Sequence, residues 1–235
     1  MCHMPTIVKD RKRTAVETRK SAVLVVDDHP LFRKGVVQLL RDEPDLEVRA
    51  EASTSNDALE LIRKHPFDLA VVDIGLEGST NGIELTKYIK AEKPKLPVLV
   101  LSMHDETLFA ERALRAGARG YVMKREALDN FIAAVRVVLR GEIFISPNMS
   151  KRMVLAHLHG DGEAESPVEK LSDRELEVLQ LLGEGKEVRE IAQRLRLSAK
   201  TVEAHRAHIK EKLQLENARQ VARFANEWVR AQQPV

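Results

Sequence analysis

The sequence has few of the residues that build disulfide frameworks, thiolate metal clusters or membrane spans. Cys2 is the single cysteine among 235 residues, so the chain can form neither an internal disulfide nor a cluster of cysteine ligands. No apolar run approaches the ~18–20 residues of a membrane-spanning helix. The first residues, MCHMPTIVKDRKRT, also lack the apolar stretch of a secretory signal. We therefore expect a cytoplasmic protein that does not contact a membrane.

The net charge of +2 conceals an uneven distribution of basic residues. Residues 1–20 contain six Lys or Arg and two Asp or Glu, whereas residues 186–223 contain ten and five. The second of these regions favours an anionic partner such as nucleic acid, although a solvated helix face is the alternative. The polar and aperiodic residues 1–20 predict a mobile tail.

From residue 21 onward, short apolar segments alternate with amphipathic ones. The strand-sized apolar segments are residues 22–26, 46–51, 68–72, 97–101 and 120–123. The segments with helical spacing are residues 30–41, 55–65, 82–92, 105–116 and 126–140. Continuous apolar strands indicate burial on both faces, and hence a parallel sheet covered by helices. We expect a doubly wound, five-stranded α/β domain over residues 21–142.

The rest of the chain predicts a connection and a smaller, all-α domain. Residues 143–168 contain a helical segment and then a linker with Gly, Glu, Ser and Pro. Residues 169–235 have the pattern of four helices. Two of these, with Ser198 as the N-cap of the second, form a helix-turn-helix pattern.

Polar side chains follow four of the five predicted strands. Asp27 and Asp28 come after the first, Asp73 after the third, Ser102 ends the fourth and Lys124 follows the fifth. The carboxyl ends of parallel strands form the functional crevice of such sheets. Three carboxylates gathered there repel one another and need either a cation or a shared proton. Among cations, Mg²⁺ suits such an all-oxygen site. Together the set predicts phosphoryl transfer, although each residue alone is equally typical of a helix cap or a solvated side chain.

At this point a resemblance supports that interpretation. Four segments resemble the receiver domain of bacterial response regulators of the NarL/FixJ type: VLVVDDHPLFRKGV, DLAVVDIGLEGSTNGIEL, VLVLSMHDE and RAGARGYVMKR. The resemblance covers about residues 21–142 and implies a flavodoxin-like fold. The loop after the central aspartate departs from the family pattern, because it is one residue longer and has no proline.

The resemblance also implies roles for the residues at the strand ends. Asp73 would be the phosphoacceptor, and Lys124 would pair with the phosphoryl group. The Mg²⁺ ligands would be Asp28, Asp73 and the Gly75 carbonyl, with Asp27 acting through water. Ser102 and Tyr121 would form a switch pair, in which the hydroxyl moves toward the phosphoryl group and the ring turns inward. The phosphodonor would be a phosphohistidine on a sensor histidine kinase.

The basic helical region resembles the LuxR-type helix-turn-helix over about residues 169–230, through LSDRELEVLQLLGEGKEVREIAQRLRLSAKTVEAHRAHIKEKLQLENARQVARFA. Spacing alone leaves double-stranded DNA binding and mere solvation equally open, and the resemblance decides for DNA. The expected DNA-binding residues are Lys200, Thr201, Glu203, Ala204, His205, Arg206, Ala207, His208 and Lys210. Relatives often carry Lys where this chain has Glu203, so we expect a different base preference. Metal binding by His205 and His208 is disfavoured, because no cysteine or third histidine is near in sequence.

The last helix suggests how two copies would associate. In related proteins this helix supports a homodimer, which would place Val221, Phe224, Ala225 and Trp228 at the contact. Packing of the same face within its own domain is an equally open alternative. Two other functions fit parts of the pattern: an enzyme of the haloacid-dehalogenase kind, and a protein-binding module that needs no phosphoryl group. The first is disfavoured because the candidate nucleophile follows the third strand, so we expect a regulator and not an enzyme.

Overall fold

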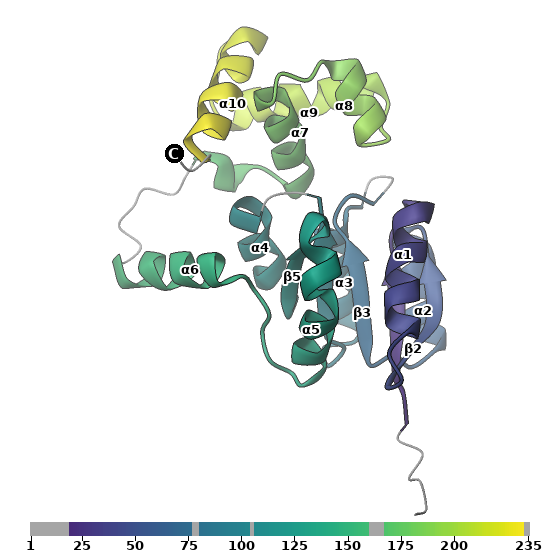
Figure 1. Cartoon of the computed structure of the whole chain (residues 1–235). Helices are drawn as coiled ribbons and strands as arrows, with labels where there is room; N and C mark the ends of the chain where they lie inside the picture. Colours follow the sequence, from purple (N-terminus) through teal and green to yellow (C-terminus); the bar gives the residue numbers. More distant parts are fainter. Residues whose placement is uncertain (1–18, 77–79, 104–105, 160–166, 233–235) are drawn as a thin grey trace, which may run out of the picture.

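The structure, a computed structural model, describes residues 19–76, 80–103, 106–159 and 167–232. Most of the predicted tail, residues 1–18, lies outside these residues. The described chain forms a five-stranded parallel sheet with helices on both faces, and a helical unit beyond one end of the sheet (Figure 1). The predicted fold class is confirmed.

The strands of the sheet run in the order β2-β1-β3-β4-β5. Their bounds are β1 (Ser21–Val26), β2 (Leu46–Ala52), β3 (Leu69–Asp73), β4 (Val98–Ser102) and β5 (Gly120–Met123). The chain builds the sheet outward from β1 to β2, and then outward from β3 in the other direction. This reversal places the topological switch point between β1 and β3, where ligands of open α/β sheets bind.

Helices cover both faces of the sheet because alternate strand residues point to opposite sides. Helices α1 (Pro30–Arg41) and α5 (Ala127–Leu139) pack on the face that carries Val25 and Val71. The opposite face is covered by α2 (Ser55–Lys64), α3 (Gly82–Glu92) and α4 (Glu106–Arg115). Strands β1, β3, β4 and β5 are thus buried on two sides, which explains their unbroken apolar sequences. The edge strand β2 instead alternates between buried and more exposed residues.

The helical unit follows the sheet domain through α6 (Pro147–His159) and a short 3₁₀ turn, η2 (Pro167–Lys170). Its helices are α7 (Asp173–Gly183), α8 (Val188–Arg194), α9 (Ala199–Lys212) and α10 (Ala218–Gln232). Local chemistry sets where two of them begin. Ser172 and Glu175 form a capping box at α7. At α9 the Ser198 hydroxyl accepts the Thr201 N–H, as the sequence predicts.

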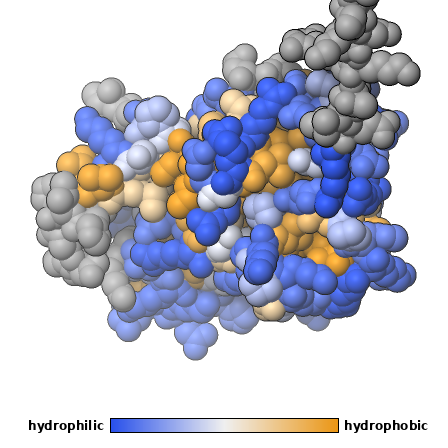
Figure 2. Space-filling view, turned by 90° about the horizontal axis from the view of Figure 1, so that it is seen from below, coloured by the Kyte–Doolittle hydropathy of each residue, from blue (hydrophilic) through white to orange (hydrophobic). Residues whose placement is uncertain are grey.

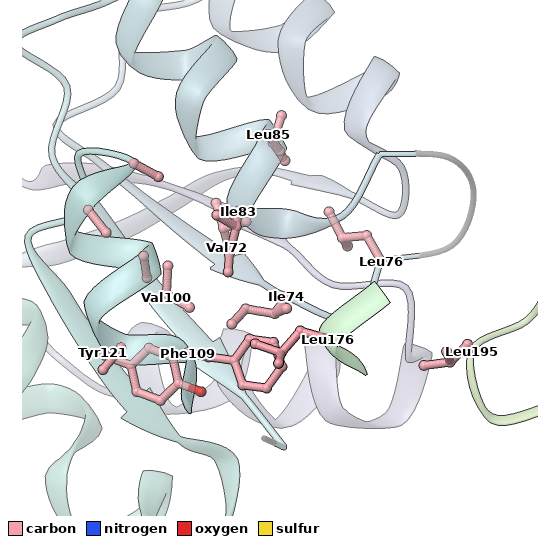
Figure 3. Packing of buried hydrophobic residues seen from close by; sticks show 14 of the residues in the cluster. Val72, Ile74, Leu76, Ile83, Leu85, Val100, Phe109, Tyr121, Leu176 and Leu195 are labelled. Carbon is pink, nitrogen blue, oxygen red and sulfur yellow. The ribbon is translucent and has the colours of Figure 1, made fainter. Parts of the chain in front are cut away.

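One continuous apolar cluster joins the helical unit to the sheet domain. Figure 3 shows Leu176 of α7 beside Phe109 and Ile74 of the sheet domain. Leu76, in the loop after β3, belongs to the same cluster and is fully buried. Helix α7 therefore packs against the end of the sheet at which the strands terminate.

The outer surface has a different character from this shared core. The face seen from below (Figure 2) is mainly hydrophilic, with hydrophobic areas between hydrophilic residues. Among the described residues, no helix combines the length and the apolar character needed to cross a bilayer.

Candidate functional site

Three carboxylates meet at the switch point of the sheet. Asp27 and Asp28 follow β1, Asp73 is the last residue of β3, and all three are at most 5% exposed. One ligand atom from each, together with one from His29, lies within 4.8 Å of every other. The convergence expected from the strand ends is thus present, and it adds a histidine that the sequence reasoning did not assign.

Lys124 supplies the positive charge inside this cluster. It stands directly after β5, in the 3₁₀ turn η1 (Lys124–Glu126). Its Nζ atom lies 2.6 Å from Oδ2 of Asp73 and 2.7 Å from Oδ2 of Asp27, and all three side chains are 3% exposed. The ammonium group also lies 4.3 Å from the centre of the Phe32 ring. The lysine is therefore held at the carboxylates and shielded from water.

The environment of Asp73 raises its proton affinity. Burial raises the pKa of Asp73 to about 6, and the negative charge of Asp27 acts in the same direction. The charge and hydrogen bond of Lys124 oppose this rise, as does a backbone hydrogen bond from Gly75. Lys124 thus favours the ionised form of Asp73, which a nucleophile requires, against the effect of burial.

The loop after Asp73 is folded tightly against it. A Cβ atom at Gly82 would lie 1.9 Å from the Asp73 carbonyl oxygen, so only glycine fits there. The Asn81 side chain begins α3 by accepting the N–H groups of Ile83 and Glu84. The sequence reasoning missed the need for Gly82, although the Asn-Gly pair marks a turn. Residues 77–79 of this longer loop lie outside the described residues.

The donor set at the strand ends fits a hard divalent cation. Both carboxylate oxygens of Asp28 are buried and accept no hydrogen bond of good geometry from the described part of the chain. Burial of a charged carboxylate costs free energy unless a cation faces it. Arg196 fills that role from 3.2 Å in this structure, and a divalent ion could also fill it. Carboxylate oxygens are the ligands that Mg²⁺ prefers, so the cluster of Asp27, Asp28 and Asp73 fits this ion.

The expected switch residues are both buried. Ser102 ends β4 and is fully buried, and Tyr121 in β5 is 2% exposed. Figure 3 shows the Tyr121 ring close to Phe109 in the apolar cluster. The resemblance implies an inward turn of this ring, and in this structure the ring already lies inside.

The helical unit also reaches the acidic cluster. The Nη1 atom of Arg196, in the turn between α8 and α9, lies 3.2 Å from Oδ2 of Asp28. On the other side, Nδ1 of His29 lies 2.8 Å from Oδ1 of Asp28. Nothing local in the sequence signals the contact with Arg196, because the two residues belong to separate domains.

A buried ion pair lies under the same domain contact. Arg174 of α7 pairs with Glu177 at 2.5 Å and donates to the Leu76 carbonyl at 3.1 Å. Glu177 is fully buried and also accepts from the Asn81 side chain at 3.3 Å. Burial raises the pKa of Glu177, and the charge of Arg174 opposes the rise. The loop between β3 and α3 is thus bonded directly to α7.

Arg112 of α4 makes a second connection between the domains. Its guanidinium donates to the carbonyls of Val168 and Leu171, both at 2.8 Å, and to the Asp173 carboxylate at 3.0 Å. Lys87 of α3 lies 3.5 Å from the other oxygen of Asp173. The start of α7 is therefore anchored to two helices of the sheet domain.

The expected DNA-binding residues all lie on α9, with different exposure. Exposed are Lys200, Glu203, Ala204, Ala207 and His208, and half-buried are Thr201, His205, Arg206 and Lys210. The docked sheet domain thus leaves five of these nine expected DNA-binding residues exposed to solvent. Glu203 pairs with Arg206 at 2.8 Å. Burial lowers the pKa of His205, with the nearby charge of Arg174 acting in the same direction, so this imidazole is neutral at neutral pH.

His205 and His208 do have an acidic neighbour that their sequence position did not reveal. A carboxylate oxygen of Glu175 lies within 4.8 Å of a nitrogen of each histidine. That carboxylate already accepts the Ser172 N–H and the Lys212 ammonium, both at 2.7 Å. We therefore assign Glu175 to the helix cap and the ion pair.

The four residues proposed for dimer contacts on α10 divide into two pairs. Val221 and Ala225 are 1% and 0% exposed within the domain's own core, whereas Phe224 and Trp228 are half-buried. Helix α10 packs closely on α7, since a Cβ atom at Gly183 would lie 2.3 Å from the Ala225 carbonyl oxygen. Packing within the domain thus accounts for Val221 and Ala225 in this structure.

Comparison with known proteins agrees with this arrangement. Residues 23–136 match the family model of the response regulator receiver domain, and residues 169–225 match that of the bacterial regulatory proteins of the luxR family. The chain is 34% identical to the transcriptional regulatory protein DegU of Brevibacillus brevis, over 92% of this chain and 98% of the relative. It is 33% identical to the oxygen regulatory protein NreC of Staphylococcus carnosus, over 86% and 95%.

A solved structure shows the same fold. RcsB from Salmonella enterica serovar Typhimurium, bound to the promoter rprA in the presence of phosphomimetic BeF3⁻, matches with a TM-score of 0.58 and 26% identity. That match covers 88% of this chain and 99% of the solved one. The chain therefore belongs to the NarL/FixJ-type response regulators, the transcriptional regulators that join a receiver domain to a LuxR-type DNA-binding domain.

Proposed function

We propose that Asp73 accepts a phosphoryl group from a phosphohistidine of a sensor histidine kinase, and that this event controls DNA binding by α9. The observation that carries the proposal is the position of the Lys124 ammonium, 2.6 Å from Asp73 and 2.7 Å from Asp27. A cation fixed beside a buried carboxylate supplies the charge neutralisation that phosphoryl transfer requires. This activity belongs in the cytoplasm, where kinase and chromosomal DNA meet.

The chemistry at Asp73 is a substitution at phosphorus. A carboxylate oxygen of Asp73 forms the new bond to phosphorus, the bond to the imidazole nitrogen of the donor breaks, and an aspartyl phosphate remains. Lys124 would pair with one phosphoryl oxygen and the Ser102 hydroxyl would donate to another. Mg²⁺ held by Asp28, Asp73 and the Gly75 carbonyl, with Asp27 acting through water, would supply further positive charge at these oxygens. Tyr121 would complete the switch by filling space next to Ser102.

For DNA recognition, α9 would enter the major groove. The exposed Lys200, Glu203, Ala204 and Ala207 would face base edges, with Glu203 accepting from a cytosine amino group. Thr201, Arg206, His208 and Lys210 would meet the phosphates at the groove edges. His205, half-buried and neutral, contributes least by its charge. The promoter complex of RcsB supports this use of the fold.

A homodimer would place two such helices on one duplex. Helix α10 offers Phe224 and Trp228 for the contact, while Val221 and Ala225 support them from the domain core. A symmetric dimer would read two half-sites about one helical turn apart.

The protein would act as a regulator and not as a phosphatase. A phosphatase assay separates the two, because sustained turnover of small phosphomonoesters would favour an enzyme. The salt dependence of DNA affinity distinguishes a regulator from a protein-docking module. If the protein contacts DNA phosphates, log affinity falls by ~0.9 per contact for each log unit of salt concentration.

The test of the proposal is selection of bound duplexes from a random pool, with and without beryllofluoride. Beryllofluoride forms a phosphoryl mimic on the aspartate. For the natural chain, we expect a symmetric DNA site to be enriched more strongly when the mimic is present. For Asp73→Asn, we expect the same enrichment with and without the mimic. Equal enrichment of the natural chain in both conditions would contradict control through Asp73.

A further inference from the structure

The acidic cluster receives positive charge from two different domains. Lys124 of the receiver domain faces Asp27 and Asp73, whereas Arg196 of the DNA-binding domain faces Asp28. The Asp28 side chain is 2% exposed, and that of Arg196 is 35% exposed. Arg196 therefore extends from the protein surface to a carboxylate inside the site.

The position of Arg196 is set by its own backbone. Its φ angle is +51°, a left-handed conformation directly after the C-cap of α8. Arg194, two residues earlier, instead lies 3.6 Å from Glu184 of its own domain. Of these neighbouring arginines, only Arg196 reaches the receiver domain in the described contacts.

We propose that Arg196 is a tethered cation that competes with divalent metal for Asp28, so that domain docking and metal loading of the phosphorylation site oppose each other. The inference rests on the proposed function of the acidic cluster. A divalent ion held by Asp28 would need the carboxylate oxygens that the guanidinium now faces. Its double charge would also repel the guanidinium.

Thermodynamic reciprocity makes the competition measurable from both sides. If docking places Arg196 on Asp28 and thereby weakens metal binding, metal binding must weaken docking by the same factor. The contacts of Arg112 and Arg174 do not involve the expected metal ligands, and they continue to favour docking when Arg196 is released. Metal would therefore loosen the domain contact without abolishing it.

The loop between β3 and α3 provides a second way for metal binding to affect domain docking. Arg174 is bonded to the Leu76 carbonyl, three residues after Asp73, and Asn81 is bonded to Glu177. If metal binding rearranged this loop, these hydrogen bonds would transmit the change directly to α7. Release of Arg196 is the step that depends on a single side chain, so it can be tested alone.

The experiment uses the full chain in four forms: natural, Arg196→Asn, Arg196→Lys and Arg194→Gln. Asparagine suits the left-handed backbone, lysine keeps the charge, and Arg194→Gln removes a nearby charge outside the contact. Mg²⁺ alone is titrated by calorimetry, and the radius of gyration is followed by small-angle scattering. We expect Arg196→Asn to bind Mg²⁺ about fivefold more tightly, Arg196→Lys to lie between it and the natural chain, and Arg194→Gln to match the natural chain.

The radius of gyration from small-angle scattering reports domain docking directly. The natural chain should expand as Mg²⁺ is added, whereas Arg196→Asn should start larger and change less. Equal Mg²⁺ affinity of the natural chain and Arg196→Asn would overturn the inference while leaving the proposed function intact. Weaker binding by Arg196→Asn would also overturn it, because Arg196 would then support the loaded site. No Mg²⁺ binding by any form would overturn the proposed metal site and the inference together.

Discussion

Lys124 and Asp73 are 51 residues apart in the chain, and Nζ of the first lies 2.6 Å from Oδ2 of the second. The same ammonium lies 2.7 Å from Asp27, which follows the neighbouring strand β1. A cation is thus inserted between two buried carboxylates that would otherwise repel. Several expectations for solution experiments rest on this relationship and on the domain contact beside it.

Replacement of the central aspartate should remove phosphoryl uptake. Asp73→Asn keeps the size of the side chain but replaces the nucleophilic carboxylate by an amide, so we expect no labelling by acetyl phosphate. Intact-mass measurement checks this, with loss of the label in hydroxylamine as evidence for an acyl phosphate. Asp57→Asn, at an exposed position in α2, is the control and should label normally. Labelling retained by Asp73→Asn would exclude Asp73 as the acceptor.

The stability of the metal-free protein should depend on the charge of Asp73. Its pKa is raised from 3.8 to about 6 in the folded state, so the folded state binds the proton more tightly than the unfolded state. Stability from this group is therefore full below about pH 4 and is lost as the pH rises through about 6. The loss is on the order of 3 kcal/mol, because each unit of pKa shift corresponds to about 1.4 kcal/mol.

Asp73→Asn removes that ionisation and provides the test. Denaturant unfolding of the natural chain and the variant is compared at about pH 4 and about pH 7, without divalent metal. We expect the variant to gain stability relative to the natural chain at the higher pH. A difference that is the same at both pH values would show that the Asp73 carboxyl is not destabilised by burial.

A phosphate contact on α9 should affect all duplexes alike. We expect Lys210→Ala to weaken binding to every sequence by a similar factor, and to lower the salt slope by about 1. The measurement is affinity at several salt concentrations for a selected and an unrelated duplex. Lys151→Ala makes the same charge change at an exposed position of α6 and should leave the slope unchanged.

A base contact on α9 should instead change which sequence is preferred. Glu203→Lys converts an acceptor into a donor at an exposed position and removes the partner of Arg206. We expect the preferred base at one position of each half-site to change, with about 1–3 kcal/mol of discrimination. Selection of bound duplexes from a random pool measures the preferred base. Glu60→Lys in the receiver domain makes the same change in net charge and serves as the control. An unchanged preference would place Glu203 away from the bases.

Loss of the Arg112 contacts should weaken the docked state. Arg112→Ala leaves the carbonyls of Val168 and Leu171 without this donor and removes a partner of Asp173, which we expect to lower stability by about 1–3 kcal/mol. The variant should also have a larger radius of gyration. Arg115→Ala, one turn further along α4, removes only an exposed pair with Glu111 and serves as the control. If both variants behaved alike, Arg112 would not hold the domains together.

The sequence by itself determined the two folds and the order of their elements. Apolar strands such as β3 and β4 can be buried on two faces only in a covered parallel sheet, and this topology brings the residues after their last positions to one edge. For that reason the sequence alone places Asp73 and Lys124 at the same edge of the sheet. Ser198 marked the start of α9 in the same local way, through its own hydrogen bond.

Only the tertiary structure decided how the two domains meet. The contact of Arg196 with Asp28 and the burial of Glu177 against Asn81 depend on how two separately folded surfaces fit together. No periodicity or motif carries that information, because the pattern within each domain does not show which residue of the other domain will face it. The same holds for α10, where the burial of Val221 and Ala225 depends on α7. Local patterns specify elements, whereas contacts between distant segments arise from shape and charge complementarity of the folded parts.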